Sequence, residues 1–210
     1  MIELFNSGGW AMYPLLFLLV AGIAVAIERG FTLTRAQIDA EGFFSGLERR
    51  LRDSGPEEAA QLCADTRGPV ASVIHAGLLR LHRGIEHVEK AIDNAGAVEM
   101  AFLERGMVWL STIANLAPMI GFLGTVSGMI NAFQAIKQAG DVDPSMVAGG
   151  ISEALITTAA GLIVGIIIQF LHNFYASRID SIIADMQEHT AGFVDILAEL
   201  GPGAGSRSAG

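Results

Sequence analysis

The sequence is poor in charge and almost free of cysteine. Only 17% of its 210 residues are charged and 51% are hydrophobic, whereas soluble domains carry roughly 25% charged residues. The single cysteine, Cys63, permits no disulfide within the chain, which excludes a disulfide-stabilised secreted domain. Acidic residues outnumber basic ones by 22 to 13, which argues against a nucleic-acid partner. A mean hydropathy of +0.47 instead indicates a membrane protein.

Three long runs contain no charged residue at all: residues 4–27, 106–136 and 154–177. A helix needs ~20 apolar residues to cross the hydrocarbon core of a bilayer, and each run is longer than that. We therefore expect an all-α integral membrane protein. Its three transmembrane helices are expected at residues 10–29, 109–135 and 151–174.

The first run also permits a cleaved signal peptide, since Ala24, Val25 and Ala26 are similar to a cleavage site. A signal peptide begins with basic residues, however, and this chain begins Met-Ile-Glu. Its first basic residues, Arg29 and Arg35, follow the apolar run instead. This order of residues favours a spanning helix.

The distribution of Lys and Arg predicts how the chain crosses the membrane. Twelve of the thirteen lie in residues 28–105 and 178–210, and the other one is Lys137. Because cytoplasmic loops carry the excess of basic residues, the N-terminus is expected outside and the C-terminus inside. The segments outside the membrane are then an external N-terminus (1–9), a cytoplasmic helical insert (30–108), a short external loop (136–150), a cytoplasmic helix (175–200) and a disordered tail (201–210).

The cytoplasmic insert is expected to be helical, with breaks at the Gly-Pro pairs 55–56 and 68–69. After Ile85 no breaker occurs until Pro118, which lies inside the second span. The sequence therefore predicts one continuous rod from residue 85 to residue 138, with a kink near Pro118.

The sequence predicts neither a metal site nor an enzyme. The spacing of His75, His82 and His87 does not suit a set of metal ligands. No nucleophile and base, phosphate-binding loop or metal motif is evident. We expect no cofactor.

The second and third spans each carry a stripe of small residues at helical spacing. Small faces let helices approach closely in lipid, where no hydrophobic drive acts between them. The residues expected to serve helix packing are Pro118, Gly121, Gly124 and Gly128 in the second span, and Gly161 and Gly165 in the third.

Hydroxyl groups matter in these spans because no carboxylate lies in the middle of any of them. Thr125 and Thr158 lie among the small residues, and Thr157 follows Glu153 by one helical turn. In one interpretation each Thr bonds to its own helix and Glu153 marks the outer interface. In the other, the three hydroxyls and Glu153 line a polar path through the membrane, and a partner supplies the carboxylate.

Two segments resemble motifs of the ExbB/TolQ/MotA proton-channel family. Residues 118–131, which include Gly-Phe-Leu-Gly-Thr-Val-Ser-Gly-Met at 121–129, resemble its second-span motif. Residues 153–162, Glu-Ala-Leu-Ile-Thr-Thr-Ala-Ala-Gly-Leu, resemble its third-span motif. The order and spacing of the motifs and the three-span topology extend the likeness over about residues 5–200, closest to the ExbB/TolQ branch.

The resemblance implies a stator subunit of a motor in the bacterial inner membrane, driven by proton-motive force. Family members form a homopentamer around single-span ExbD- or TolR-like helices, each of which carries a membrane Asp. Thr125 and Thr158 match the pore-lining threonines, and Glu153 matches the glutamate at the outer mouth. Further implied contacts are membrane lipid and a TonB- or TolA-like transducer, with no nucleic acid.

Three alternatives stay open at this point. Thr157 departs from the Ala or Gly of many proton-driven members, and a Thr pair is similar to the sodium-driven flagellar relatives. Sodium as the translocated ion is therefore one alternative to H⁺. A non-conducting scaffold for a partner needs the small-residue stripes but no hydroxyls. A solute transporter is disfavoured, because three spans show no internal repeat.

Overall fold

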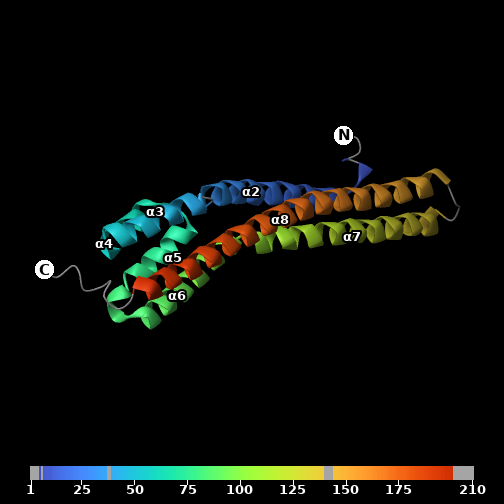
Figure 1. The fold of residues 1–210 in the computed structure, drawn as a ribbon. Coiled ribbons are helices and arrows are strands. Elements are labelled where there is room, and N and C mark those ends of the chain that lie inside the picture. Colours follow the sequence, from blue (N-terminus) through green and yellow to red (C-terminus); the bar gives the residue numbers. More distant parts are fainter. Residues whose placement is uncertain (1–4, 6, 37–38, 140–143, 201–210) are drawn as a thin grey trace. The chain divides into compact units, whose positions relative to one another are not determined.

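The computed structural model describes residue 5 and residues 7–36, 39–139 and 144–200. Over these residues every regular element is a helix (Figure 1). The elements are α2 (Met12–Ala36), α3 (Ala40–Asp53), α4 (Pro56–Asp65), α5 (Pro69–Leu78), the 3₁₀ helix η1 (Leu81–Arg83), α6 (Ile85–Glu104), α7 (Met107–Ala139) and α8 (Pro144–Leu200). Three helical stretches, which contain α2, α7 and α8, are long and apolar enough to cross a membrane. The expected all-α fold with three spans is confirmed.

The chain forms two compact units. The membrane unit comprises Met1–Arg29 and Gly106–Tyr175, and the extramembrane unit comprises Gly30–Arg105 and Ala176–Gly210. The span expected at 109–135 lies inside α7 and the span expected at 151–174 lies inside α8, whereas α2 begins two residues after the expected start of the first span. Residues 140–143 of the expected external loop and the expected tail at 201–210 lie outside the described residues.

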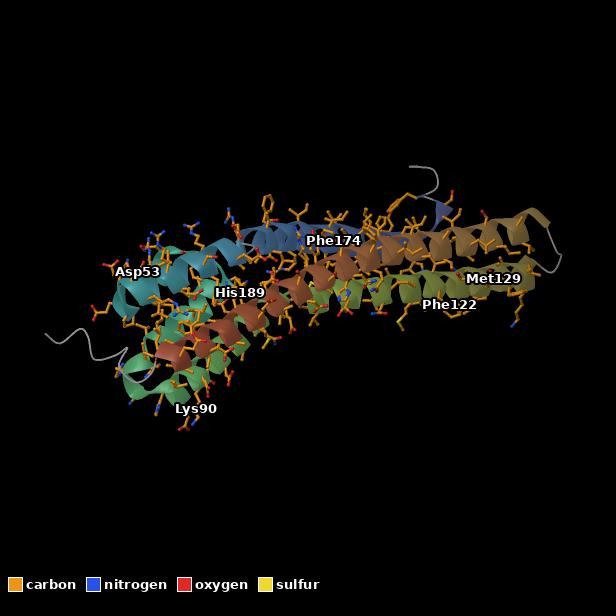
Figure 2. The ribbon with its side chains drawn as sticks, viewed as in Figure 1. Asp53, Lys90, Phe122, Met129, Phe174 and His189 are labelled. Carbon is orange, nitrogen blue, oxygen red and sulfur yellow. The ribbon has the colours of Figure 1, made fainter. Side chains whose placement is uncertain are left out.

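The membrane unit exposes large apolar side chains. Figure 2 shows two of them, Phe122 on α7 and Phe174 on α8, which are 66% and 55% exposed. Phe17 on α2 is 71% exposed. Helices that are apolar on their outer faces as well as their inner ones suit a lipid environment, where outward burial of apolar groups is favourable.

The expected continuous rod from residue 85 to residue 138 is wrong. The chain leaves the helix at Arg105, and Gly106 takes a positive φ of 89° before α7 begins. A Cβ atom at Gly106 would lie 3.2 Å from Nε of Arg29, whose side chain is buried and paired with Glu28. The break therefore needs glycine for its backbone conformation and for the close approach of Arg29. Helix α7 itself continues through Pro118.

The extramembrane unit is a helical bundle with its own apolar core. The Gly-Pro pairs at 55–56 and 68–69 begin α4 and α5, as expected, because proline suits the first helical position. The glycines of both pairs have positive φ, and so does Gly84, which precedes α6. The buried core consists of Leu47, Leu51, Ala59, Cys63, Val70, Val73, Ile74, Leu78, Val88, Ile92, Met186, Phe193 and Leu197. The end of α8 thus completes a core that is otherwise formed by the insert.

The thiol of Cys63 lies in this core, and burial raises its pKa to about 12 from the ordinary value of 9.0. A raised pKa means that the folded state holds its proton where the unfolded state has lost it. The contribution of this thiol to the free energy of unfolding is therefore complete below pH 9. It is lost as the pH rises towards 12, by about 1.4 kcal/mol per pH unit. We expect the free energy of unfolding in detergent to fall more steeply above pH 9 in the wild type than in Cys63→Ala. Parallel pH profiles for the two proteins would contradict this.

Candidate functional site

Helices α7 and α8 touch backbone to backbone in the membrane unit. A Cβ atom at Gly161 would lie 2.7 Å from the carbonyl oxygen of Ala117 and 2.8 Å from Cα of Gly121. A Cβ atom at Gly121 would lie 3.0 Å from the carbonyl oxygen of Thr157. Because these neighbours are backbone atoms, no rotation of a side chain would make room. The two glycines are what permits this approach.

The other small residues extend the contact in both directions. A Cβ atom at Gly165 would lie 2.7 Å from Cγ of Pro118, and one at Gly128 would lie 3.2 Å from Cβ of Ala154. Gly124 faces Thr157 and also Ala11, which precedes α2. All six residues expected to serve packing therefore lie at contacts of α7 with α8 or with the N-terminal segment.

The close approach of the helices brings Thr125 and Thr158 together. Their two hydroxyl groups are hydrogen-bonded to each other across the interface. The Thr125 hydroxyl also lies 3.1 Å from the carbonyl oxygen of Ala154, and the Thr158 hydroxyl lies 3.3 Å from that of Gly121. Both side chains are half-buried. Among the described residues, the hydrogen-bond partners of Thr158 lie on α7, so this residue does not simply bond to its own helix.

The Thr125–Thr158 pair permits two arrangements of its protons. Thr125 can donate to the Ala154 carbonyl while it accepts from Thr158. Alternatively, Thr158 donates to the Gly121 carbonyl while it accepts from Thr125. Each hydroxyl has one proton and two lone pairs, so rotation of the two hydroxyls converts one arrangement into the other. Such a pair can reverse the direction of its hydrogen bond, but it transfers a proton only if a group outside the pair supplies one and another group accepts one.

Thr157 faces a different direction from its neighbour. Its side chain is 1% exposed, and its hydroxyl contacts the carbonyl oxygens of Gly8 at 2.9 Å and Glu153 at 2.7 Å. The bond to Glu153 is the intrahelical bond, four residues back, that is common for a membrane threonine. The structure therefore separates Thr157 from the Thr125–Thr158 pair and places it against the N-terminal segment of its own chain.

Residues 8–10 are a part of the site that the sequence did not predict. Gly9 has a positive φ of 63°, and the carboxylate of Glu153 occupies the space that a side chain at Gly9 would need. Trp10 donates from Nε1 to the hydroxyl of Ser127 on α7 at 3.2 Å. The signal was a Gly-Gly-Trp sequence just before an apolar run, since tryptophan favours the membrane interface.

The arrangement offers hydroxyls, carbonyls and one carboxylate, and it does not resemble a metal centre. Among the residues that the structure describes, no group of three or more His, Cys, Asp or Glu side chains is placed to hold a metal ion. Chemically, the site can exchange protons along hydrogen bonds. Glu153 adds a negative charge one turn from Thr157 on the same helix.

Comparison with known proteins identifies the family of this chain. Residues 65–188 match the sequence profile of the MotA/TolQ/ExbB proton channel family. The chain is 32% identical over 180 residues to a biopolymer transport protein ExbB homolog of Methanothermobacter thermautotrophicus, an alignment that covers 85% of this chain and 64% of that protein. It is 33% identical over 173 residues to an ExbB-like protein of Synechocystis, covering 79% and 66%. It is 36% identical over 113 residues to the Tol-Pal system protein TolQ of Haemophilus influenzae, covering 54% and 50%.

The chain spans about two thirds of the length of the first two relatives and half the length of the third. The family match covers more than half of this chain and includes both members of the Thr125–Thr158 pair. With three apolar helices, this is a multi-pass membrane protein. The chain belongs to the MotA/TolQ/ExbB proton channel family.

Proposed function

We propose that this chain is the ion-conducting stator subunit of a membrane motor that is driven by proton-motive force. The observation that carries the proposal is the Thr125–Thr158 pair, in which two hydroxyls meet across the glycine contact between α7 and α8. Family membership supplies the class of transport. In this proposal the subunits form a homopentamer in the inner membrane, with the N-terminus outside and the C-terminus in the cytoplasm.

The carboxylate that this chain lacks in the middle of its spans would come from a single-span ExbD- or TolR-like partner with a membrane Asp. A charged Asp is costly against an apolar wall and tolerable against hydroxyls and water. Protonation from outside would let the Asp pass the apolar wall, and release inside would restore its charge. A potential of 100 mV supplies about 2.3 kcal/mol for each charge that crosses. Movement of one set of subunits past the other would act on a TonB- or TolA-like transducer.

Glu153 and Thr157 have separate roles in this proposal. Glu153 would raise the concentration of cations at the outer mouth of the path, since a fixed negative charge attracts them. Thr157 would hold the N-terminal segment in place through the Gly8 carbonyl, because its hydroxyl is already bonded and fully buried.

The same geometry favours protons over sodium. A desolvated Na⁺ needs several oxygen ligands around one point, whereas a proton needs only a hydrogen-bonded relay. The hydroxyl of Thr157 points to Gly8, so it does not join the other two hydroxyls in a common set of ligands.

Ion flux in proteoliposomes tests the proposed function. The vesicles would contain this chain and a single-span ExbD- or TolR-like partner, with a pH dye and a Na⁺ dye read in parallel. We expect proton flux that follows the imposed potential and is independent of sodium. Flux that scales with Na⁺ at constant pH would show that the translocated ion is sodium and not the proton. Absence of flux from a well-assembled complex would favour the scaffold.

The scaffold is retained as a second candidate because of the glycine contacts. The packing of α7 on α8 through Gly121 and Gly161 would stabilise a complex without conducting any ion. A scaffold would need these glycines and would tolerate loss of the hydroxyls at Thr125 and Thr158. Partner retention measured beside flux separates the two functions.

A further inference from the structure

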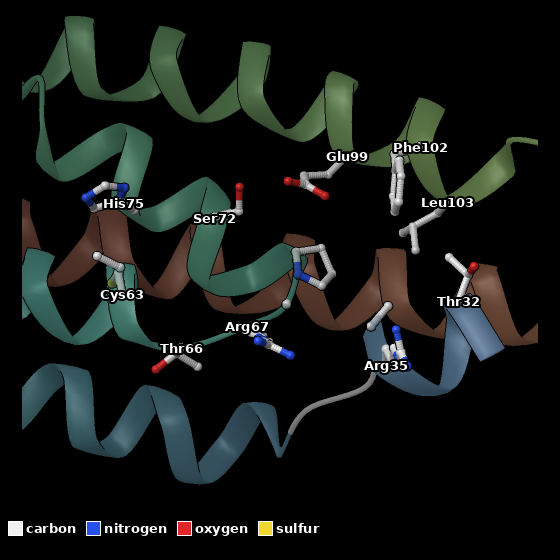
Figure 3. Close-up of a pocket in the computed structure, with 14 residues that line it drawn as sticks. Thr32, Arg35, Cys63, Thr66, Arg67, Ser72, His75, Glu99, Phe102 and Leu103 are labelled. Carbon is white, nitrogen blue, oxygen red and sulfur yellow. The ribbon is translucent and has the colours of Figure 1, made fainter.

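The extramembrane unit contains a cavity of about 650 Å³ that the proposed ion path does not use. Its walls come from the end of α2, from α4, α5 and the α4–α5 turn, and from the end of α6 (Figure 3). A volume of this size is typical of sites for small ligands, which run from roughly 300 to 1,000 Å³.

Two guanidinium groups line this cavity without a partner. Arg35 lies at the end of α2 and Arg67 in the turn between α4 and α5. Neither forms an ion pair or hydrogen bond with any residue that the structure describes, in contrast to Arg29 and Arg52, which pair with carboxylates. Guanidinium groups suit phosphate oxygens, because their planar donors can bind two oxygens at once.

The Ser72 side chain near the start of α5 adds a neutral donor to the same wall. Gly68 precedes the helix with a positive φ of 132°, and no side chain caps its first turn. The hydroxyl of Ser72 lines the cavity and has no partner among the described residues, whereas that of Thr66 is already bonded to the Leu62 carbonyl. Together with the two arginines, the Ser72 hydroxyl favours an anion.

A carboxylate and an apolar wall limit which anion fits. Glu99 of α6 lines the cavity and forms no ion pair with a described residue, so a plain anion would meet its repulsion (Figure 3). A ligand that also carries an amine would instead be attracted to it. Leu103 and the half-exposed ring of Phe102 supply an apolar surface beside these charges.

We propose that this cavity binds a zwitterionic phosphate ester, with its phosphate at Arg35, Arg67 and the start of α5 and its amine at Glu99. The ester is carried by a membrane phospholipid or by a small soluble molecule. Arg35 follows Ile27, the last residue of the charge-free run, by eight positions on α2, which is roughly 12 Å of helical rise. The headgroup layer extends roughly 5–8 Å beyond the hydrocarbon core, and the long side chain of Arg35 can reach back along the helix towards it.

Native mass spectrometry of the full chain in detergent tests the proposal, with phosphatidylethanolamine, phosphatidylglycerol and phosphatidylcholine added in turn. Titration with soluble phosphoethanolamine and with inorganic phosphate, followed by calorimetry, forms the second arm. We compare the wild type with Arg35→Gln/Arg67→Gln and with Glu99→Gln. The matched control is Arg49→Gln/Arg50→Gln, which removes the same charge from the exposed face of α3, outside the cavity.

We expect phosphatidylethanolamine to bind best and the Arg35/Arg67 variant to bind it about tenfold more weakly or worse, with the control unchanged. Glu99→Gln should shift the preference towards phosphatidylglycerol. Binding of phosphoethanolamine without any lipid would support a soluble ligand at the same site. Equal binding by the Arg35/Arg67 variant, an equal loss in the control, or no binding in either arm would overturn the proposal. None of these results depends on ion flux, so the proposed function stands or falls separately.

Discussion

Thr158→Val is expected to lower proton flux through the assembled complex by about a hundredfold or more. Valine keeps the shape of the side chain and removes the hydroxyl that links Thr125 to the Gly121 carbonyl. The relay then has no donor at that point, and positioned proton-transfer groups contribute about 10²–10⁴ to rates. The measurement is the initial rate of the pH dye in proteoliposomes under a fixed potential.

Two matched variants make this result specific. Thr158→Ser retains the hydroxyl and should recover most of the flux. Thr157→Val removes the neighbouring hydroxyl on the other face of α8 and should leave the flux largely intact while it lowers thermal stability, since the Gly8 carbonyl loses its donor. If Thr158→Val conducts normally, or if Thr157→Val alone abolishes flux, the Thr125–Thr158 pair is not the path.

Gly161→Ala is expected to have the largest effect on the folding of the membrane unit. Its new methyl group would lie 2.7 Å from the Ala117 carbonyl oxygen and 2.8 Å from Cα of Gly121, so α7 and α8 would have to move apart. Overpacking of this kind costs about 1–3 kcal/mol, and separation of the helices would also weaken the Thr125–Thr158 bond. We expect a clearly lower melting temperature in detergent and a loss of partner retention.

Gly149→Ala is the control for this substitution, because it adds the same methyl group to the same helix. No heavy atom lies within 4 Å of the position that its Cβ would take. Alanine is favoured over glycine within a helix by roughly 0.5–1 kcal/mol, so this variant should be as stable as the wild type or slightly more stable. If Gly161→Ala and Gly149→Ala have the same melting temperature in detergent, the glycine contact between α7 and α8 is not tight.

The spanning helices could be predicted because a helix in lipid needs a long run without charged residues. Such runs can be read directly from the sequence. The break at Gly106 does not follow in the same way. A single glycine is tolerated in many helices, and what fixes this one is Arg29, which packs against it from a distant part of the chain. A conformation that depends on a tertiary contact leaves no local pattern.

Part of the candidate site could likewise be predicted from the sequence, and part depends on tertiary contacts. Thr125 and Thr158 are recognisable because they lie in the two segments that resemble family motifs, and the helix contact that joins them follows from the glycines. Their separation from Thr157 follows from the helical period, which turns adjacent residues about 100° apart. The contacts of Gly8, Gly9 and Trp10 depend on how the N-terminal segment folds back on α7 and α8, which the sequence does not specify.

The other described partners of the Thr125–Thr158 pair are backbone carbonyls: Thr125 contacts those of Ala154 and of Gly121 on its own helix, and Thr158 contacts that of Gly121. The acceptors at both hydroxyls are therefore the same kind of group, and the pair by itself does not favour proton movement in one direction. Any preference for one direction would have to come from the gradient, from Glu153 or from the partner's carboxylate. A motor built on such a symmetric element would run backwards when the gradient is reversed.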